Sequence, residues 1–347
     1  MSEHTVLPLL NSAFEPGKAL EAVERIEDVD FRCIARAELF YFTGGARECS
    51  EIVESYLTDE RLELRLSACM LYGYANLSLG NAWAARRALE EIQECLRRAL
   101  REKAPKEVMA SCVFAGYVGA VLLHLPTEGI PSLWEFSGLL PEGLRLFAIY
   151  VMAHQSYLNG EIWSAYGMGR AALLMASKVY PISMTYMRCM MAMCMMNRKH
   201  KAEAQVELQQ AWELAKMDNF LEPFIEHHGL LRGLIEACIR KSDPDAYRRI
   251  TEGVLSFSRG WMTIHNPETE WKVTNELSTM EFSIAMLACR DWSNREIAEH
   301  IGVSLNTVKH YLTDIFNKLH VKKRDELKRE YRCGRGSLCK ALPAAFD

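Results

Sequence analysis

A predicted helix near the C-terminal end carries the side chains best suited to chemistry. Four polar residues share one face of it at helical spacing: Asn306, Lys309, His310 and Thr313. The opposite face repeats the apolar residues Val308, Leu312 and Ile315, which should anchor the helix to a core. Such a helix can lie in the major groove of DNA, where polar side chains meet the donors and acceptors of base edges.

The residues before this helix position it. Ala298 is small enough to let two helices approach closely, and Gly302 can adopt a left-handed backbone at little steric cost. Ser304 stands where its side chain can cap the following helix. A short helix, a tight turn and a second helix in this order predict a helix-turn-helix.

The same segment resembles the LuxR-type DNA-binding domain. That family's pattern runs Leu-Thr-Pro-Arg-Glu, Ser-Asn-Lys-Glu-Ile-Ala, Val-Ser-x-x-Thr-Val-Lys, Lys-Leu-x-Val and Arg-x-Glu-Leu. The corresponding blocks, in the family's order and spacing, are Leu277–Glu281, Ser293–Ala298, Val303–Lys309, Lys318–Val321 and Arg324–Leu327. So many ordered blocks make the resemblance specific, although it covers only this one stretch.

Four positions depart from the family pattern. Thr279 and Met280 replace Pro-Arg, so the first helix of the domain lacks its usual proline start. Asp291 stands where a helix-ending glycine is expected, and Asp enters left-handed geometry more readily than most residues. Tyr311 replaces the commoner histidine. None of these changes removes a residue that should enter the groove.

The resemblance implies roles for individual residues. Three should face base edges: Lys309, His310 and Thr313. Seven should contact phosphates: Arg295, Ser304, Asn306, Thr307, Lys318, Lys322 and Arg324. The final helix should form a two-fold dimer contact on DNA through Leu327 and Tyr331, unless it only closes the domain core. The expected partners are double-stranded DNA and a second copy of the chain, with RNA polymerase as a further candidate.

Positive charge is concentrated where contact with phosphate would need it. The chain has 41 Lys and Arg against 45 Asp and Glu, a net charge of -4. From Val273 onward 12 basic residues stand against 10 acidic ones, and the preceding part holds the remaining 29 against 35. Within Leu305–Lys340 the balance is 10 basic to 4 acidic. An acidic body would help keep the rest of the molecule off DNA.

The first 260 residues repeat a helical pattern. A turn-forming residue is followed five positions later by a small residue, with apolar residues four and seven positions further on. Copies begin at Gly44, Gly80, Gly160, Lys199 and Lys241. The interval Phe114–Pro141 should hold one more copy. Each copy describes a pair of helices that buries its apolar side on its neighbours.

This pattern resembles tetratricopeptide-like repeats of the kind attached to some large LuxR-type regulators, such as the maltose regulator, and a generic α-solenoid fits equally well. We therefore expect an all-α chain. A helical-repeat (tetratricopeptide-like) solenoid should occupy residues 1–260, and a linker residues 261–275. A four-helix LuxR-type helix-turn-helix domain should occupy residues 276–332, and a loose tail residues 333–347.

A methionine-rich run spans Met184–Met196, with seven Met and two Cys in thirteen residues. It could pack in a helix core, line a malleable apolar pocket or bind Cu(I). Because the run surrounds both faces of a helix whereas metal ligands converge on one point, core packing is favoured and no metal site is expected. A ligand pocket here would use Met187, Met190, Met191 and Cys194.

Signatures of catalysis are missing from the sequence. We find no GxxxxGK[ST] phosphate loop, no Gly-x-Ser-x-Gly elbow after a strand and no HExxH, so we expect no catalytic residues and no cofactor. The 11 cysteines lack CxxC spacing and fit reduced thiols in a cytoplasm. Met109–Pro126 is long and apolar, but its Ser, His and Gly residues favour a buried core helix over a membrane span.

These observations favour a cytoplasmic one-component transcription regulator, whose helical-repeat body senses a small ligand or a protein partner. One alternative is a scaffold or adaptor tethered to DNA, which binds peptides or proteins through the solenoid. Exposed aromatic and Arg pairs on the concave surface would favour the adaptor, whereas a closed apolar pocket near Met184–Met196 would favour a small-molecule sensor. An enzyme concealed in the body is a further alternative that no residue constellation supports.

Overall fold

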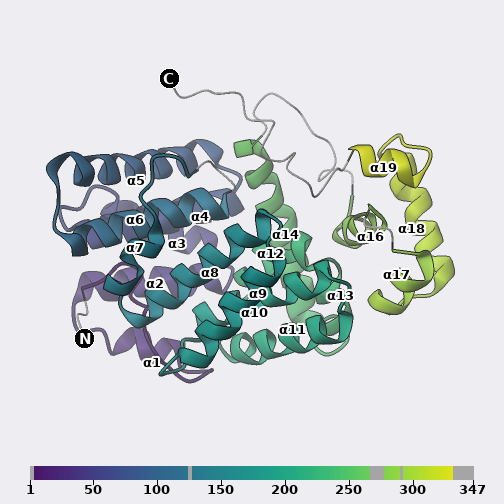
Figure 1. The fold of residues 1–347 in the computed structure, drawn as a ribbon, viewed down its shortest axis with the longest axis horizontal. Helices are drawn as coiled ribbons and strands as arrows, with labels where there is room; N and C mark the ends of the chain where they lie inside the picture. The colour runs from purple at the N-terminus through teal and green to yellow at the C-terminus, as the bar shows by residue number, and fades with distance from the viewer. Residues whose placement is uncertain (1–3, 124–126, 266–276, 290–291, 331–347) are drawn as a thin grey trace.

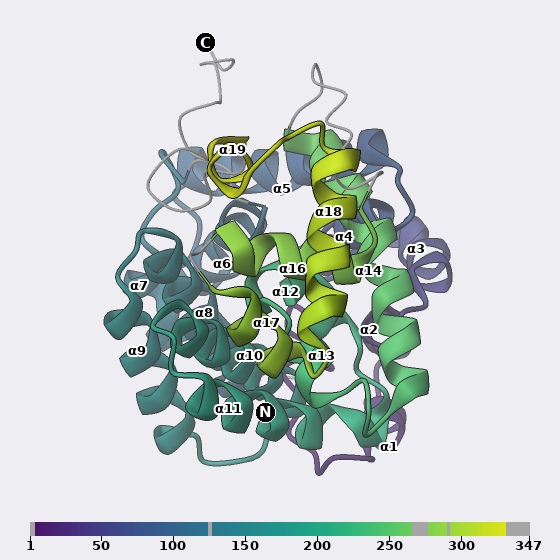
Figure 2. The ribbon, with the colours of Figure 1, turned by 90° about the vertical axis from the view of Figure 1, so that its right-hand side faces the viewer.

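The computed structural model describes residues 4–123, 127–265, 277–289 and 292–330, and within these ranges every regular element is helical (Figure 1). The all-α prediction is therefore confirmed for the described part of the chain. A large body contains most of the helices, and a small C-terminal domain lies against one end of it, beside α12, α13 and α14 (Figure 2).

The body is built from helix pairs that follow one another along the chain. The first helices of the pairs, called the inner row, are α2 (Val29–Phe42), α4 (Leu62–Ser78), α6 (Lys106–Leu122), α8 (Glu142–Leu158), α10 (Pro181–Asn197) and α12 (Glu222–Leu231). The second helices, called the outer row, are α3 (Ala46–Val53), α5 (Ala82–Glu102), α7 (Leu133–Phe136), α9 (Ile162–Met175), α11 (Lys201–Ala215) and α13 (Leu234–Cys238). The body also includes α1 (Ala19–Glu24), α14 (Pro244–His265) and 3₁₀ turns at Glu54–Tyr56, Ser137–Leu139 and Lys216–Asp218.

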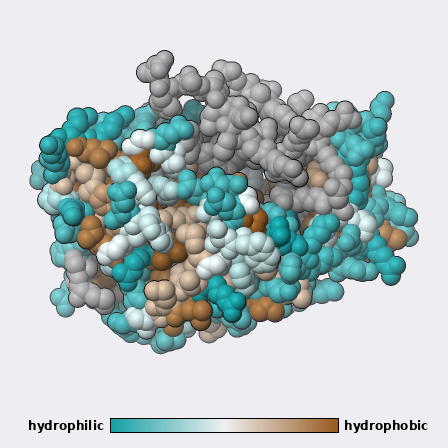
Figure 3. All heavy atoms as spheres, in the orientation of Figure 1, coloured by the Kyte–Doolittle hydropathy of each residue, from teal (hydrophilic) through white to brown (hydrophobic). Residues whose placement is uncertain are grey.

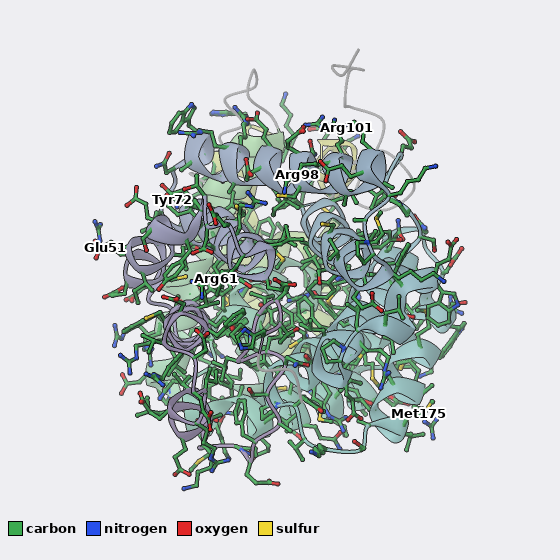
Figure 4. The ribbon with its side chains drawn as sticks, turned by 90° about the vertical axis from the view of Figure 1, so that its left-hand side faces the viewer. Glu51, Arg61, Tyr72, Arg98, Arg101 and Met175 are labelled. Carbon is green, nitrogen blue, oxygen red and sulfur yellow. The ribbon has the colours of Figure 1, made fainter. Side chains whose placement is uncertain are left out.

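The two rows differ in burial. Helices α8 and α10 of the inner row are buried on most of their circumference, whereas α5 and α9 of the outer row keep one face in solvent. On α5 this face carries Arg98 and Arg101, which project away from the body (Figure 4). The surface seen in the view of Figure 1 is mostly hydrophilic, with hydrophobic residues scattered over it (Figure 3). The hydrophobic core therefore lies between the rows and inside the inner row.

The repeats predicted from the sequence correspond to the turns inside the helix pairs. The residues that begin four of the copies have a positive φ: Gly44 (87°), Gly80 (74°), Gly160 (86°) and Lys199 (62°). The small residues that follow three of them are buried in the next helix: Ala85, Ala165 and Ala204. The pair α6 and α7 occupies the interval in which no copy could be recognised. Left-handed turns and small contact residues are thus the local signals that produce the pairs.

The inner row closes on itself. The backbone N–H of Leu221, just before α12, donates to the carbonyl of Phe42 at the end of α2 (2.7 Å). Arg249 of α14 donates to the carbonyl of Thr43 (3.0 Å). The N-terminal segment fills the interior, where the Glu38 carboxyl accepts hydrogen bonds from the backbone N–H groups of Leu9 (2.8 Å) and Leu10 (2.9 Å). The body is therefore a closed arrangement of helices with a plugged centre.

The methionine-rich run is core. Met187, Met190 and Met191 are each at most 2% exposed. They crowd Gly169 of α9, where an added Cβ would lie 2.9 Å from the Met191 side chain and 3.0 Å from that of Met190. Cys194 contacts the Met190 sulfur at 3.6 Å. Side chains thus fill the space that the alternative ligand pocket would have used, and the cavity of about 40 Å³ in the described body is lined by other residues.

Two further expectations concern the apolar stretch Met109–Pro126 and the predicted linker. Of the apolar stretch Met109–Pro126, residues 109–122 belong to α6 within the body, and no helix of the described part is long and apolar enough to cross a membrane. Helix α14 continues to His265, so the first five residues of the predicted linker (261–275) are helical. The rest of that linker, Tyr331 and the predicted tail (333–347) lie outside the described residues.

The packing of the N-terminal segment against Gly143 of α8 can be tested by substitution. A Cβ added at Gly143 would lie 2.6 Å from the Asn11 Cα and 2.9 Å from the Leu10 carbonyl oxygen, both of which are backbone atoms. We expect Gly143→Ala to lower the free energy of unfolding by about 1–3 kcal/mol. Gly167→Ala on α9 meets no atom within 4 Å and should raise it by about 1 kcal/mol through helix propensity. Urea denaturation of both variants measures the two opposite shifts.

Candidate nucleic-acid interface

Two helices and a turn form the predicted helix-turn-helix. The domain contains α16 (Thr279–Cys289), α17 (Asn294–Ile301), α18 (Leu305–Lys318) and α19 (Arg324–Glu330). Ser293 caps α17 in a capping box with Glu296, whose carboxylate accepts the Ser293 N–H (2.7 Å). Gly302 ends α17 with φ 74°, and the Ser304 hydroxyl oxygen accepts the Thr307 N–H at the start of α18 (3.0 Å). Each of these local roles except the Ser293 box follows from the sequence prediction.

The faces of α18 are arranged as predicted. Val308, Leu312 and Ile315 are at most 5% exposed and anchor the helix to the domain core. The four polar residues of the opposite face are exposed: Asn306, Lys309, His310 and Thr313. Figure 2 shows α18 on the side of the domain that is turned away from the body. The face predicted to meet base edges is therefore open to a DNA duplex in this arrangement.

The residues predicted to contact phosphate divide into two groups. Ser304, Asn306 and Lys322 are exposed beside α18, and exposed Arg295 is paired with Glu299 (3.1 Å). The second group is engaged within the domain itself. Thr307 is half-buried and hydrogen-bonded to the Ser304 hydroxyl (2.7 Å), and Lys318 forms an ion pair with Glu281 (2.7 Å). Arg324 donates to the Trp292 carbonyl (2.5 Å) and to the Asn294 side chain.

Helix α16, which lacks the family's proline, begins with a capping box formed by Ser278 and Glu281. The Ser278 N–H donates to the Glu281 carboxylate (2.7 Å), and the Ser278 hydroxyl accepts the Glu281 N–H (3.3 Å). This reciprocal capping box satisfies the backbone N–H groups of Ser278 and Glu281. Glu281 also pairs with Lys318, so the same carboxylate joins the start of α16 to the end of α18.

The last helix closes the domain core. Leu327 of α19 is fully buried, and its carbonyl lies 3.8 Å from the Cys289 sulfur of α16. A dimer contact through α19 would therefore have to use its other residues, or require Leu327 to leave the core. Tyr331, the second residue predicted for that contact, lies outside the described residues.

Comparison with known proteins identifies this domain. Residues 275–330 match the family model described as "Bacterial regulatory proteins, luxR family". The segment is therefore a LuxR-family helix-turn-helix domain, a DNA-binding domain of transcription regulators. Neither the curated proteins nor the solved structures contain a match to the chain, so the resemblance of the body to that of maltose-type regulators stays a prediction.

A buried polar network joins this domain to the body, and the sequence analysis did not anticipate it. Glu236 of α13 is 1% exposed and accepts hydrogen bonds from two sides. His228 at the end of α12 contacts its Oε1 at 2.9 Å, and the Ser283 hydroxyl of α16 donates to the same oxygen at 3.1 Å. Burial raises the pKa of Glu236, but the neighbouring His228 and these hydrogen bonds outweigh it and hold the pKa below its ordinary value.

The turn of the helix-turn-helix is held by a second set of contacts. His300 Nε2 lies 3.2 Å from the Arg232 carbonyl oxygen, and the Arg240 guanidinium donates to the Ile301 carbonyl (3.0 Å). Arg232 is itself buried in a left-handed conformation (φ 53°), and its side chain donates to the Tyr157 hydroxyl (3.0 Å). The body thus binds the turn through one constrained carbonyl and one guanidinium.

Small residues of the body let the domain approach closely. A Cβ at Gly229 would lie 3.1 Å from the Phe282 ring. Gly233, at φ 77°, lies against Ile301, Leu287 and His300 of the domain. At the edge of the same contact, the Lys201 ammonium sits 4.1 Å from the centre of the buried Trp292 ring, a cation–π distance. The contact is therefore packed as well as hydrogen-bonded.

Acid should loosen this contact. Burial lowers the pKa of His300 to about 4, although the hydrogen bond to Arg232 opposes the shift. A depressed pKa means that the docked state favours neutral His300. The stabilisation is complete above the ordinary pKa near 6.5 and is lost as the pH falls toward 4. Between pH 7.5 and pH 5 we expect docking to lose up to about 2 kcal/mol.

Hydrogen–deuterium exchange in α17, corrected for intrinsic rates, measures this loss as faster exchange at pH 5. His300→Gln should exchange alike at both pH values, because its amide can still donate to the Arg232 carbonyl but cannot titrate. The exposed His320 serves as the control, and His320→Gln should respond as the parent chain does. Equal protection of α17 at pH 5 and 7.5 in the parent chain would contradict the assignment.

Proposed function

We propose that the chain is a sequence-specific, one-component transcription regulator whose helical body controls how its DNA-binding domain is presented. The observation that carries this proposal is the LuxR-family match over residues 275–330, together with the exposure of the polar face of α18. Regulators of this family bind DNA, so the DNA-binding role itself follows from the match. Sequence specificity and sensing are the proposed parts.

Base recognition is assigned to three exposed residues of α18. Lys309 can donate to the guanine acceptors O6 and N7, and Thr313 can meet a thymine methyl group or a polar edge. His310 lies beside Lys309 on the same face. Phosphate contacts are assigned first to four exposed residues, of which Arg295 is paired with Glu299 and Ser304 bonded to Thr307: Arg295, Ser304, Asn306 and Lys322. Contacts by Thr307, Lys318 and Arg324 would compete with their bonds inside the domain.

Binding as a two-fold dimer is proposed from family resemblance, with half-sites about one helical turn apart. Helix α19 would form the contact between copies. Its Asp325 is exposed, whereas Leu327 supports the helix from the core. Tyr331 remains the predicted apolar residue of this contact. RNA polymerase is a further proposed partner once the dimer occupies its site.

Sensing by the body is proposed because the DNA-binding domain is docked rather than tethered alone. A change in α12 or α13 would reach α16 through Glu236 and reach the turn through the Arg232 carbonyl. Two global arrangements that differ in this contact would bind DNA differently, which is what coupling between sites requires.

The adaptor alternative has a specific observation in its favour. Exposed tryptophans stack with arginines in two pairs: Trp83 with Arg87 at 5.0 Å, and Trp163 with Arg198 at 5.3 Å. Such pairs are typical of protein-binding surfaces. However, the two tryptophans lie on α5 and α9 of the outer row, whereas an adaptor groove was expected along the concave side. The inner row instead encloses a cavity, which favours a small-molecule sensor.

Replacement of Lys309 tests base recognition. Lys309→Ala should weaken binding to the preferred duplex by about 1–3 kcal/mol and relax the preference at one base pair, because one donor to a base edge is lost. The preferred duplex is first selected from random sequences with the parent protein, and affinities are then measured at one salt concentration. Lys178→Ala, an exposed lysine of the body, is the matched control and should bind as the parent does. Equal weakening on every sequence would make Lys309 a phosphate contact instead.

A further inference from the structure

A cavity of about 40 Å³ lies inside the inner row. Helices α2, α4, α6, α8, α10 and α12 each contribute to its wall, so it occupies the centre of the closed body. Its most distinctive lining is aromatic and acidic: Tyr41, Phe42, Tyr74, Phe147, Tyr186 and Glu226. Aliphatic side chains, including Leu7 and Leu10 of the N-terminal segment, complete it. A carboxyl group in a largely apolar cavity is unfavourable unless a partner compensates it.

The carboxyl groups beside this cavity have hydroxyl partners but no cationic ones. Glu226 accepts a hydrogen bond from the Tyr41 hydroxyl, and Tyr186 also bonds to it. Glu222, one turn earlier on α12, is 3% exposed and accepts from the Ser78 hydroxyl (3.3 Å). In the described part of the chain, neither carboxyl is joined to a Lys, Arg or His side chain. Glu222 is therefore buried and Glu226 half-buried, and neither carboxyl group has a compensating positive charge.

This arrangement is costly when both carboxyl groups are ionised. Burial raises the pKa of Glu226 to about 7, and burial together with the charge of Glu226 raises the pKa of Glu222 above its ordinary range. A positively charged ligand would offset the charge of these carboxylates and gain the attraction of the aromatic faces around it, which favour cations.

We propose that this cavity binds a compact organic cation, with the Glu226 carboxylate as its counter-charge and the Tyr41, Tyr74 and Tyr186 rings as its cage. The volume corresponds to roughly three water molecules, which suits a cation of about two to five non-hydrogen atoms. Ammonium groups, primary to quaternary, form this chemical class. An uncharged molecule of the same size would leave the carboxyl groups uncompensated.

The cavity and the DNA-binding domain share one helix. Glu226 and His228 are two residues apart on α12, so they project toward different sides of it. Glu226 lines the cavity, and His228 contacts Glu236, which accepts the Ser283 hydroxyl of α16. A cation at Glu226 would therefore act on the helix that holds the domain. This effector role rests on the proposed function, whereas binding in the cavity does not.

Titration calorimetry and thermal denaturation of the full chain test the site. Methylammonium and tetramethylammonium chlorides are the probes, tert-butanol is the uncharged match for the larger one, and sodium chloride keeps the ionic strength constant. At least one ammonium ion should bind saturably, with a Kd on the order of millimolar, and raise the melting midpoint. No saturable binding of either ion, or equal binding of tert-butanol, would overturn the proposal.

Substitutions test whether the ammonium ion binds in this cavity. Glu226→Gln should weaken the ammonium ion at least tenfold, while Glu299→Gln, on the exposed face of α17, should leave it unchanged. Circular dichroism verifies that each variant folds. Tyr74→Leu gives a second decision, since loss of one ring should weaken the ammonium ion without affecting tert-butanol. Unchanged affinity in both Glu226→Gln and Tyr74→Leu would show that the ion binds elsewhere and overturn the assignment.

The proposed function and the cavity site can be refuted independently of each other. Binding of the ammonium ion by a chain that shows no sequence preference in DNA would refute the regulator and leave the cavity site intact. Sequence-specific DNA binding without ammonium binding would do the opposite. If both occur, saturation with the ammonium ion should change the affinity for the preferred duplex, and Glu226→Gln should abolish that change.

Discussion

A single buried carboxylate, that of Glu236, ties the two parts of this molecule together. It lies in α13 of the body and meets His228 of α12 and Ser283 of the DNA-binding domain at hydrogen-bond distance. Removing His228 would leave the buried Glu236 carboxylate with only the Ser283 hydroxyl as a side-chain partner, which costs far more than an exposed ion pair returns. Because the network needs all three elements in place, it makes the docked arrangement specific, and the glycines at 229 and 233 make it sterically accessible.

The construction of the body gives α12 its special position. A row of inner helices that closes on itself must have a last member that contacts both the first helix and whatever follows the row. Helix α12 has this place, with Leu221 bonded to Phe42 on one side and His228 directed to Glu236 on the other. The same helix carries Glu222 and Glu226 into the interior. The same helix therefore lines the interior of the body and contributes to the contact with the DNA-binding domain.

Local signals were readable from the sequence, and long-range contacts were not. Gly302, Ser304 and the apolar spacing of α18 act within a few residues, so the helix-turn-helix and its exposed face could be predicted. Arg324 carries the same charge whether it faces phosphate or the Trp292 carbonyl, and only the fold decides between them. Glu236 and Ser283 are 47 residues apart and form no motif, so their pairing left no pattern to find. The methionine run is conspicuous in composition, whereas the cavity is assembled from residues scattered over six helices and the N-terminal segment.

A distance measurement tests the central claim that the DNA-binding domain is docked on the body. Spin labels on non-canonical amino acids at Val206 of α11 and Thr313 of α18, both exposed, would report their separation by pulsed dipolar spectroscopy. The account predicts one narrow distance distribution at pH 7.5 for the chain without DNA. A broad distribution, as two independently moving parts would give, would contradict it.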